Sequence, residues 1–181
     1  MAILQLKISL KVISPPVWRR ILVEDNITFD RLNNIIQATM GWGGYHLYVF
    51  DVGGEEIGIP DKEFDVDMTD SRRAYISKYL YAENQKFEYV YDFGDNWQHT
   101  IILEKILRKD PNGKYPICIK GKNACPPDDC GGPWGYKELL EAIKNPSHEE
   151  HKEMLEWIGG GKFDPEEFDI DDVNEELSEY Q

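Results

Sequence analysis

The sequence predicts an α+β protein with a mixed or antiparallel sheet, and two observations lead to this prediction. Segments with the period-two alternation of half-buried strands fill most of the first two thirds of the 181-residue chain. Segments with helical periodicity follow after residue 130. Strands first and helices last are typical of the α+β class, so we expect the C-terminal helices to pack on the sheet.

The first elements are a predicted hairpin, a helix and a third strand. Residues 4–10 alternate between apolar and polar side chains, and residues 17–23 form the predicted returning strand after two prolines. Thr28 is the expected N-cap of a helix that ends at Gly41, and residues 45–50 are the third strand. This order of elements resembles the start of a β-grasp fold.

The second half of the sheet comes from residues on either side of a DFGDNW turn. Residues 51–86 contain no long strand pattern and are predicted to form an insertion or excursion. Residues 87–93 and 97–107 alternate as two strands of a hairpin. A DPNG turn then predicts that residues 115–121 form a further strand, paired with the second strand of that hairpin.

Three helices are predicted after the Cys-containing loop. Pro133 stands where the first turn of a helix favours proline. Ser147 and Glu150 have the spacing of a capping box for the next helix. The acids and proline of residues 164–167 repeat a helix start signal, so residues 162–181 are the expected acidic helical segment.

Length and composition predict one globular domain over residues 1–181. Hydrophobic residues make up 41% of the chain and aromatic residues 12%, which is typical of a packed core. No apolar run approaches the roughly 20 residues that cross a bilayer, and the N-terminus lacks the features of a signal peptide. We therefore expect a cytoplasmic protein without a membrane partner. The three cysteines, an odd number, exclude a complete disulfide framework.

The charge distribution bears on possible partners. The net charge of −14 argues against nucleic acid, but residues 148–181 hold 2 Lys and Arg against 13 Asp and Glu and account for −11 of it. Residues 105–122 hold six Lys and Arg, among them Lys105, Arg108 and Lys109, against one Asp. This stretch predicts contact with phosphate or an acidic partner, although lysines also protect edge strands from aggregation.

The CPPDDCGG loop offers a candidate metal site. Cys125 and Cys130 are separated by four residues and could supply two thiolates to zinc. Cys118, His46 or His99 could complete a tetrahedral site. Two alternatives stay open, since the cysteines could pack the loop as small buried residues or act as a redox or nucleophilic pair.

A second candidate site combines polar and aromatic side chains near the ends of the predicted strands. Polar residues among aromatic ones can line a binding pocket. The alternative is that the histidines are ordinary half-buried residues of the sheet. The residues are His46, Tyr91, Asp92, Asp95, Trp97 and His99.

Two motifs suggest enzyme classes that the rest of the chain excludes. A DFG triplet at residues 92–94 occurs in protein kinases, but no glycine-rich nucleotide loop and no HRD motif precede it. Two histidines at residues 148–151 lie three positions apart, whereas the zincin motif needs four.

Several long blocks of the sequence resemble one known family. They are LKISLKVISPPVWRRILV, ITFDRLNNIIQATMGW, YHLYVF, YVYDFGDNWQHTIILEK and CPPDDCGGPWGY. In this order they closely resemble the plasmid pRiA4b ORF-3-like family, whose members are also labelled transposon passenger TnpR-like proteins. The resemblance implies a small α+β protein of mostly prokaryotic distribution. The resolvase-like label lacks support, because Ser9 and Ser14 are not set among the arginines that a serine recombinase needs.

Two functions are consistent with these observations. The resemblance implies a protein of plasmid or mobile-element biology, and the expected function is a non-catalytic module that binds a protein or a nucleic acid. The alternative is a metal-binding protein, with zinc as the candidate ion, or an enzyme whose site contains Cys125, Cys130, His46 and His99.

Overall fold

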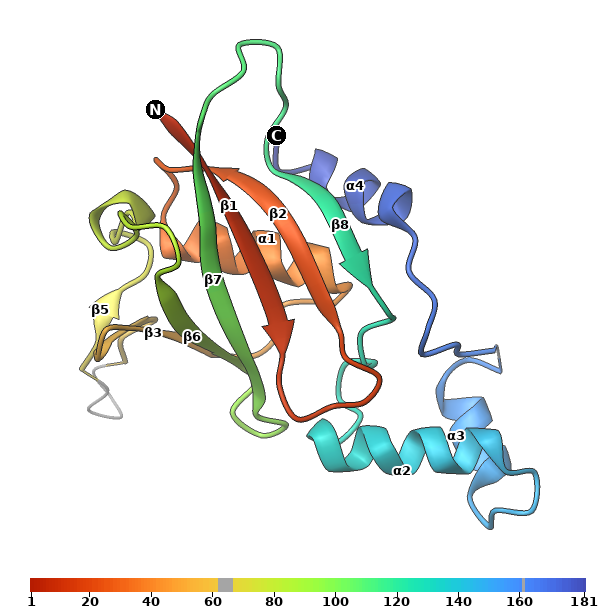
Figure 1. Cartoon of the computed structure of the whole chain (residues 1–181). Helices are drawn as coiled ribbons and strands as arrows, with labels where there is room; N and C mark the ends of the chain where they lie inside the picture. The colour runs from red at the N-terminus through yellow and green to blue at the C-terminus, as the bar shows by residue number, and fades with distance from the viewer. Residues whose placement is uncertain (62–66, 161) are drawn as a thin grey trace.

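The centre of the molecule is an eight-stranded sheet, which we describe from a computed structural model that covers residues 1–61, 67–160 and 162–181 (Figure 1). The strand order is β5-β4-β3-β6-β7-β1-β2-β8, and every neighbouring pair is antiparallel except β4 and β5. The strands are β1 (Ala2–Leu10), β2 (Trp18–Glu24), β3 (Tyr48–Val52), β4 (Glu55–Gly58), β5 (Thr69–Asp70), β6 (Lys86–Tyr91), β7 (Trp97–Arg108) and β8 (Ile117–Lys122).

Four α-helices accompany the sheet. They are α1 (Phe29–Met40), α2 (Gly132–Lys144), α3 (His151–Trp157) and α4 (Ile170–Ser178), and a short 3-10 helix spans Ile76–Lys78. Helix α1 covers one face of the sheet, and α4 lies beside β8 on the same side (Figure 1). Helices α2 and α3 lie together at the end where the β1–β2 and β6–β7 turns are found. None of the described helices covers the opposite face of the sheet (Figure 1). The α+β class and the packing of C-terminal helices on the sheet are confirmed.

The helix that was predicted from Thr28 to Gly41 is confirmed together with both of its caps. The Thr28 side chain accepts a hydrogen bond from the Arg31 amide, which satisfies one of the free N–H groups at the helix start. Gly41 ends the helix with φ = 80°, a left-handed conformation that glycine adopts at low cost. The apolar face of α1 then packs against the inward-facing side chains of the strands.

The predicted pairing of the last strand was wrong. Strand β8 pairs with β2 and not with β7. Both edges of β7 are already occupied, because β1 pairs with it from Ala2↔Arg108 to Leu10↔His99 and β6 pairs with it on the other side. The chain after the DPNG turn therefore reaches the free edge of β2.

The resemblance to a β-grasp start extends to the order of elements but not to the pairing of strands. The hairpin, helix and strand follow one another as expected. Strand β3 begins at Tyr48, later than predicted, and lies between β4 and β6, so β6 and β7 separate it from the β1–β2 hairpin. The excursion of residues 51–86 holds β4 and β5 and extends the sheet at this edge.

The starts of the last two helices also differ from the sequence expectation. Helix α3 begins after Glu150 without a side-chain cap, and no residue of it is fully buried. Helix α4 begins after Asp169, whose carboxylate accepts hydrogen bonds from the Asp171 and Asp172 amides. An Asp followed by further acids gives a start signal at several positions of this segment, and the sequence pattern placed it too early. None of the helices that the structure describes is long and apolar enough to span a membrane.

Candidate metal centre

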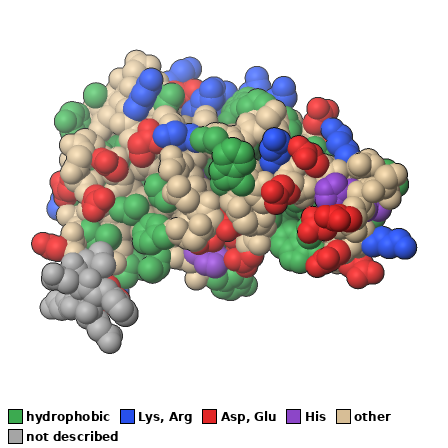
Figure 2. All heavy atoms as spheres, turned by 90° about the horizontal axis from the view of Figure 1, so that it is seen from below, with side chains coloured by type: hydrophobic (Ala, Val, Ile, Leu, Met, Phe, Trp, Pro, Cys, Tyr) green, Lys and Arg blue, Asp and Glu red, His purple; other side chains and the backbone are tan. Residues whose placement is uncertain are grey.

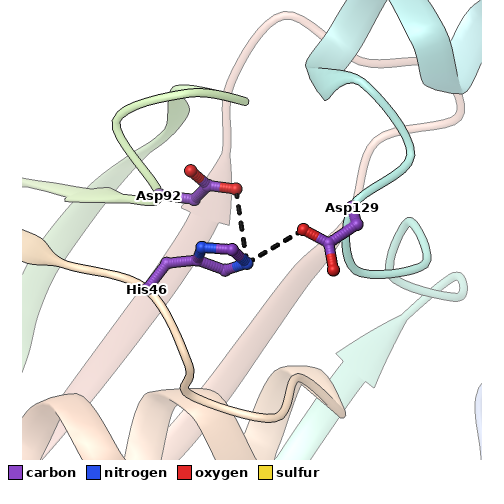
Figure 3. A group of neighbouring side chains, drawn as sticks. All are labelled: His46, Asp92 and Asp129. Atoms are coloured by element: carbon purple, nitrogen blue, oxygen red, sulfur yellow. Dashed lines mark ion pairs between the residues drawn. The ribbon is translucent and has the colours of Figure 1, made fainter.

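Three segments that are far apart in the sequence meet at one end of the sheet. The first is the loop after α1, the second is the turn between β6 and β7, and the third is the loop of residues 125–132. They place His46, Asp92 and Asp129 side by side (Figure 3). His, Cys, Asp and Glu side chains can all supply a metal ligand. Among the described residues of these types, these three form a group whose ligand atoms all lie within 4.8 Å of one another.

The three side chains point at a common volume. Nε2 of His46 lies 2.9 Å from Asp129 Oδ1 and 3.7 Å from Asp92 Oδ2 (Figure 3). The exposed fraction of the side chain is 10% for Asp92, 31% for His46 and 68% for Asp129. The group is therefore anchored in the protein at Asp92 and open to solvent at Asp129.

Asp92 is positioned by the turn that it begins. Its amide donates to Leu47 O, which joins the turn to the segment that carries His46. Its Oδ1 accepts from the Gly94 amide at 2.9 Å, so Oδ2 is the oxygen that faces the imidazole. Asp92 has φ = 53°, a left-handed conformation that is uncommon outside glycine and that occurs preferentially at functional sites.

Asp129 is positioned by contacts that hold the CPPDDCGG loop against the other two segments. Trp42 Nε1 donates to Pro126 O at 2.8 Å, and the Gly131 amide donates to Asp95 Oδ2 at 3.1 Å. A Cβ atom on Gly132 would lie 2.3 Å from Asp95 O, so only glycine fits at this point. The GG pair thus serves the docking of the loop onto the DFGDN turn.

The donor atoms have the spacing that a shared metal ion requires. Two ligands at about 2.1 Å from one ion are about 3.0 Å apart in octahedral geometry and about 3.4 Å apart in tetrahedral geometry. The observed separations of 2.9 and 3.7 Å bracket these values. Nε2 of His46 is shielded from solvent and has no hydrogen bond of acceptable geometry in the described part of the chain, although Asp129 Oδ1 is close. A positive ion between the three groups would satisfy all of them.

Comparisons with known proteins identify the family. The model of the family described as "Plasmid pRiA4b ORF-3-like protein" matches residues 2–172. The chain belongs to the plasmid pRiA4b ORF-3-like family. One relative is "Uncharacterized protein y4hQ" of Sinorhizobium fredii (strain NBRC 101917 / NGR234), which is 36% identical over 179 residues, 98% of this chain and 92% of the relative.

A solved structure has the same fold. It is the crystal structure of "Protein of Unknown Function MM3350" from Methanosarcina mazei Go1, which is similar with a TM-score of 0.86 and 43% identity. The match covers 95% of this chain and 97% of the other. The resemblance stated from the sequence is therefore confirmed, and the pRiA4b ORF-3-like fold extends over nearly the whole chain.

Of the two histidines predicted as ligands, only His46 lies in the group of three. His99 is fully buried in the core of this pRiA4b ORF-3-like protein, with Nδ1 3.3 Å from Tyr89 O and its ring edge-on to Trp42. Burial lowers the pKa of His99 to about 4, so the imidazole is neutral at physiological pH. Ring contacts run in turn from His46 to Tyr91, Trp42 and His99, which places two aromatic rings between the histidines.

The two cysteines predicted as ligands are free thiols in partly buried positions. Cys125 donates to Met40 Sδ and accepts from the guanidinium of Arg19 at 3.4 Å. Burial raises the pKa of Cys125 to about 11 and that of Cys130 to about 12, and Asp95 contributes to the second shift. Without a metal both cysteines are therefore thiols near neutral pH, and zinc binding or attack on an electrophile would require loss of the thiol proton.

The aromatic members of the predicted pocket belong to the core. Tyr91 and Trp97 are fully buried, and each ring stacks on Trp42, at centroid distances of 5.2 and 5.8 Å. The Tyr91 hydroxyl donates to Asp128 Oδ2, and burial followed by the charge of Asp128 raises the pKa of Tyr91 to about 12. Tyr91 and Trp97 thus contact Trp42 of the first loop, and Tyr91 also contacts Asp128 of the CPPDDCGG loop. Asp95 accepts a hydrogen bond from the Gly131 amide of the same loop.

The basic residues predicted as a binding surface lie at the far end of β7. Lys105 and Arg108 are exposed, and Lys109 forms an ion pair with Glu24. They are at the other end of β7 from the turn that carries Asp92.

Asp92 and Asp129 were not predicted as ligands from the sequence, since Asp92 was named only as a pocket residue and Asp129 was not named for either site. The DD pair at residues 128–129 was considered only for its effect on the cysteines. The residues of this loop indicate a turn, because Pro, Asp and Gly favour turns, but they do not indicate where the carboxylates point. Asp129 is far from His46 in the sequence, so no local pattern indicates that their side chains are in contact.

Proposed function

We propose that the protein binds a divalent metal ion through His46 Nε2, Asp92 Oδ2 and Asp129 Oδ1. The observation that carries the proposal is the convergence of one imidazole and two carboxylates at metal-ligand spacing, with Nε2 buried and without a hydrogen bond in the described residues. Buried polar atoms in native proteins are nearly always satisfied, and the groups within reach of Nε2 are these two carboxylates, which a metal ion could share with it.

The donor set indicates the class of metal. Carboxylates suit Mg²⁺, Ca²⁺ and Mn²⁺, and imidazole suits Zn²⁺, Fe²⁺ and Ni²⁺. One nitrogen with two oxygens therefore favours Mn²⁺, Fe²⁺ or Zn²⁺ over a soft ion that needs thiolates. Three protein ligands leave coordination positions for water or an exogenous ligand, which is typical of catalytic sites and not of closed structural ones.

The open side of the group faces an accessible part of the molecule. Asp129 also lines a cavity of about 230 Å³ whose walls include Leu139 of α2 and Met154 of α3. A small ligand that enters this cavity would approach the exposed carboxylate of Asp129. We therefore place the exogenous ligand of the metal on the α2–α3 side.

The alternative ligand set of Cys125, Cys130, His46 and His99 has less support. It needs two thiolates where burial favours thiols, and it needs His99 to leave the core. No three of these four residues belong to the group of converging ligand atoms in the part of the chain that the structure describes.

Calorimetric titration of the metal-free protein with Zn²⁺ and with Mn²⁺ tests the proposal. We expect one ion per chain in the wild type and loss of binding in Asp129→Asn, since a neutral amide is a weaker ligand. Asp164→Asn is the matched control, because it removes the same charge from a loop outside the group and keeps the turn bond to the Glu166 amide. Equal binding by Asp129→Asn and the wild type, or no binding at all, would overturn the proposal.

A second candidate function is that of a non-catalytic interaction module in plasmid or mobile-element biology, and we propose it beside the first. Its support is the family's plasmid-derived description and a sheet face that carries cations, in a protein of net charge −14, and that none of the described helices covers. Pull-down of a defined anionic polymer by the wild type, and its loss when cations of that face are reversed, would test it.

A further inference from the structure

The open face of the sheet carries a cluster of cations over β1, β2 and β8. The strand register places Lys7, Arg20 and Lys120 in one row across the three strands. The next row places Ser9, Trp18 and Lys122 together. We call this surface the basic sheet face, and its members are Lys7, Lys11, Trp18, Arg20, Lys120 and Lys122.

The charge of this face is only partly neutralised. Glu104 binds Arg20 through two hydrogen bonds of 2.6 and 2.8 Å, and Glu88 pairs with Lys11 at 3.0 Å. Lys120 and Lys122 are exposed and form no ion pair with any residue that the structure describes. The two lysines therefore keep their charges available to a partner.

The basic sheet face contrasts with the rest of the molecule. The charged residues of 148–181, whose net charge is −11, lie in and around α3 and α4 and not on the open face. Lys and Arg side chains gather along the upper edge of Figure 2, which is the side of the molecule that faces the viewer in Figure 1. An acidic protein that concentrates cations on one flat face presents a site for a polyanion.

We infer that the basic sheet face binds single-stranded nucleic acid. Trp18 is partly exposed at the centre of the face, with Lys7 Nζ 5.4 Å and Arg20 Cζ 5.3 Å from its ring centroid. Cations beside an aromatic ring on an open sheet are the elements with which proteins hold phosphates and stack unpaired bases. None of the helices in residues 1–61, 67–160 and 162–181 projects from this face to enter the major groove of a duplex.

This inference rests on the interaction-module function and specifies its partner, and it is independent of the metal site. The probe is a fluorescently labelled oligothymidylate of about 20 nucleotides, titrated with the protein at low ionic strength. The double variant Lys120→Glu and Lys122→Glu tests the face. Its matched control, Lys152→Glu with Lys162→Glu, changes the net charge equally but alters exposed lysines outside the face.

We expect the Lys120 and Lys122 variant to bind the oligonucleotide at least about tenfold more weakly, with a salt slope that is smaller by about two. The control variant should bind like the wild type. Equal losses in the two variants would contradict the inference, because net charge would then explain binding.

Two further arms identify the partner class. Duplex DNA of the same sequence should bind more weakly than the single strand, and equal affinity would overturn the assignment to single strands. Labelled polyglutamate that binds through the same lysines, while the oligonucleotide does not, would overturn the nucleic-acid inference and leave the interaction-module function standing. Absence of binding to both polymers would contradict both proposals.

Discussion

The core beneath α1 and the loop end of the sheet differ in the groups that surround their buried polar side chains. In the core, the Tyr89 hydroxyl accepts from Gln37 Nε2 and donates to Asn33 Oδ1, both at 2.6 Å. At the loop end, Tyr136 OH and His46 Nε2 are shielded from solvent and have no hydrogen-bond partner in the described residues. Within the core, Gln37 Oε1, Trp97 Nε1 and His99 Nε2 also have no hydrogen-bond partner among the described residues. The two regions differ in what surrounds these atoms, since His46 Nε2 faces two carboxylates at 2.9 and 3.7 Å, whereas the His99 ring lies among aromatic rings.

The backbone conformation also differs between the core and the loop end. Asp92, Asn96 and Asp129 at the loop end have φ values of 53°, 56° and 59°, whereas α1 and the strands around it have regular geometry. Non-glycine residues in this conformation cost free energy and persist where surrounding contacts hold them. Here the contacts are those that dock the CPPDDCGG loop onto the DFGDN turn.

The largest expected effect is a loss of packing in the core. Phe29 is fully buried, with ring contacts to Phe50 at 5.1 Å and to Tyr79 at 5.4 Å. Phe29→Ala should lower the free energy of unfolding by about 3–5 kcal/mol, because it leaves a cavity. Trp134→Ala removes a larger ring that is 78% exposed at the loop end and should cost less than about 0.5 kcal/mol. Urea denaturation measures the free energy of unfolding of both variants. Similar losses in the two variants would contradict the proposed difference between the core and the loop end.

Removal of one hydroxyl from each region sharpens the comparison. Tyr89→Phe leaves Asn33 Oδ1 and Gln37 Nε2 without their partner and should cost about 1–3 kcal/mol. Tyr136→Phe removes a buried hydroxyl that has no partner among the described residues, so it should be neutral or stabilising. Chemical denaturation of the two variants in parallel is the measurement. A clear loss of stability in Tyr136→Phe would show that this hydroxyl is satisfied.

The pH dependence of stability reports the burial of His99. Desolvation lowers the pKa of His99 from 6.5 to about 4. Between these two pH values His99 is protonated in the unfolded chain and neutral in the folded protein. The contribution of neutral His99 to the free energy of unfolding is therefore fully present above pH 6.5 and is lost as the pH falls toward 4. The expected loss is about 2 kcal/mol between pH 7 and pH 5. His99→Gln should flatten this slope in urea titrations at several pH values. An unchanged slope would mean that other groups cause it.

The smallest expected effect on stability is that of Asp129→Asn in the absence of metal. The side chain is 68% exposed, and asparagine adopts φ = 59° as readily as aspartate. We expect the free energy of unfolding to change by less than about 0.5 kcal/mol. Thermal denaturation of both proteins in a chelator checks this, and a large loss would identify Asp129 as a structural residue.

Much of the fold could be predicted from local sequence signals. The caps of α1, the β1–β2 hairpin and the β6–β7 hairpin follow from turn residues and alternation that act over short distances. The place of β8 could not be predicted, because a DPNG turn suggests a local hairpin and gives no information on which strand edge is free. Pairing between distant strands depends on competition for edges, which no local pattern records.

The candidate site was predicted in part. His46 and Asp92 were expected to be neighbours because the strands that precede or follow them were expected to be adjacent. In the CPPDDCGG loop the cysteines were predicted as ligands, whereas the residue that lies beside His46 is Asp129. Whether a side chain of a loop points at a site depends on how the loop docks, and here Gly132 and Asp95 decide this.

A crystal structure of the protein soaked with Mn²⁺, recorded with anomalous scattering, tests the central claim most directly. The account predicts one strong anomalous peak at about 2.0–2.2 Å from His46 Nε2, Asp92 Oδ2 and Asp129 Oδ1. It also predicts that the peak is absent from crystals of Asp129→Asn treated in the same way. A peak at the cysteines, or none near His46 in the wild type, would contradict the metal centre.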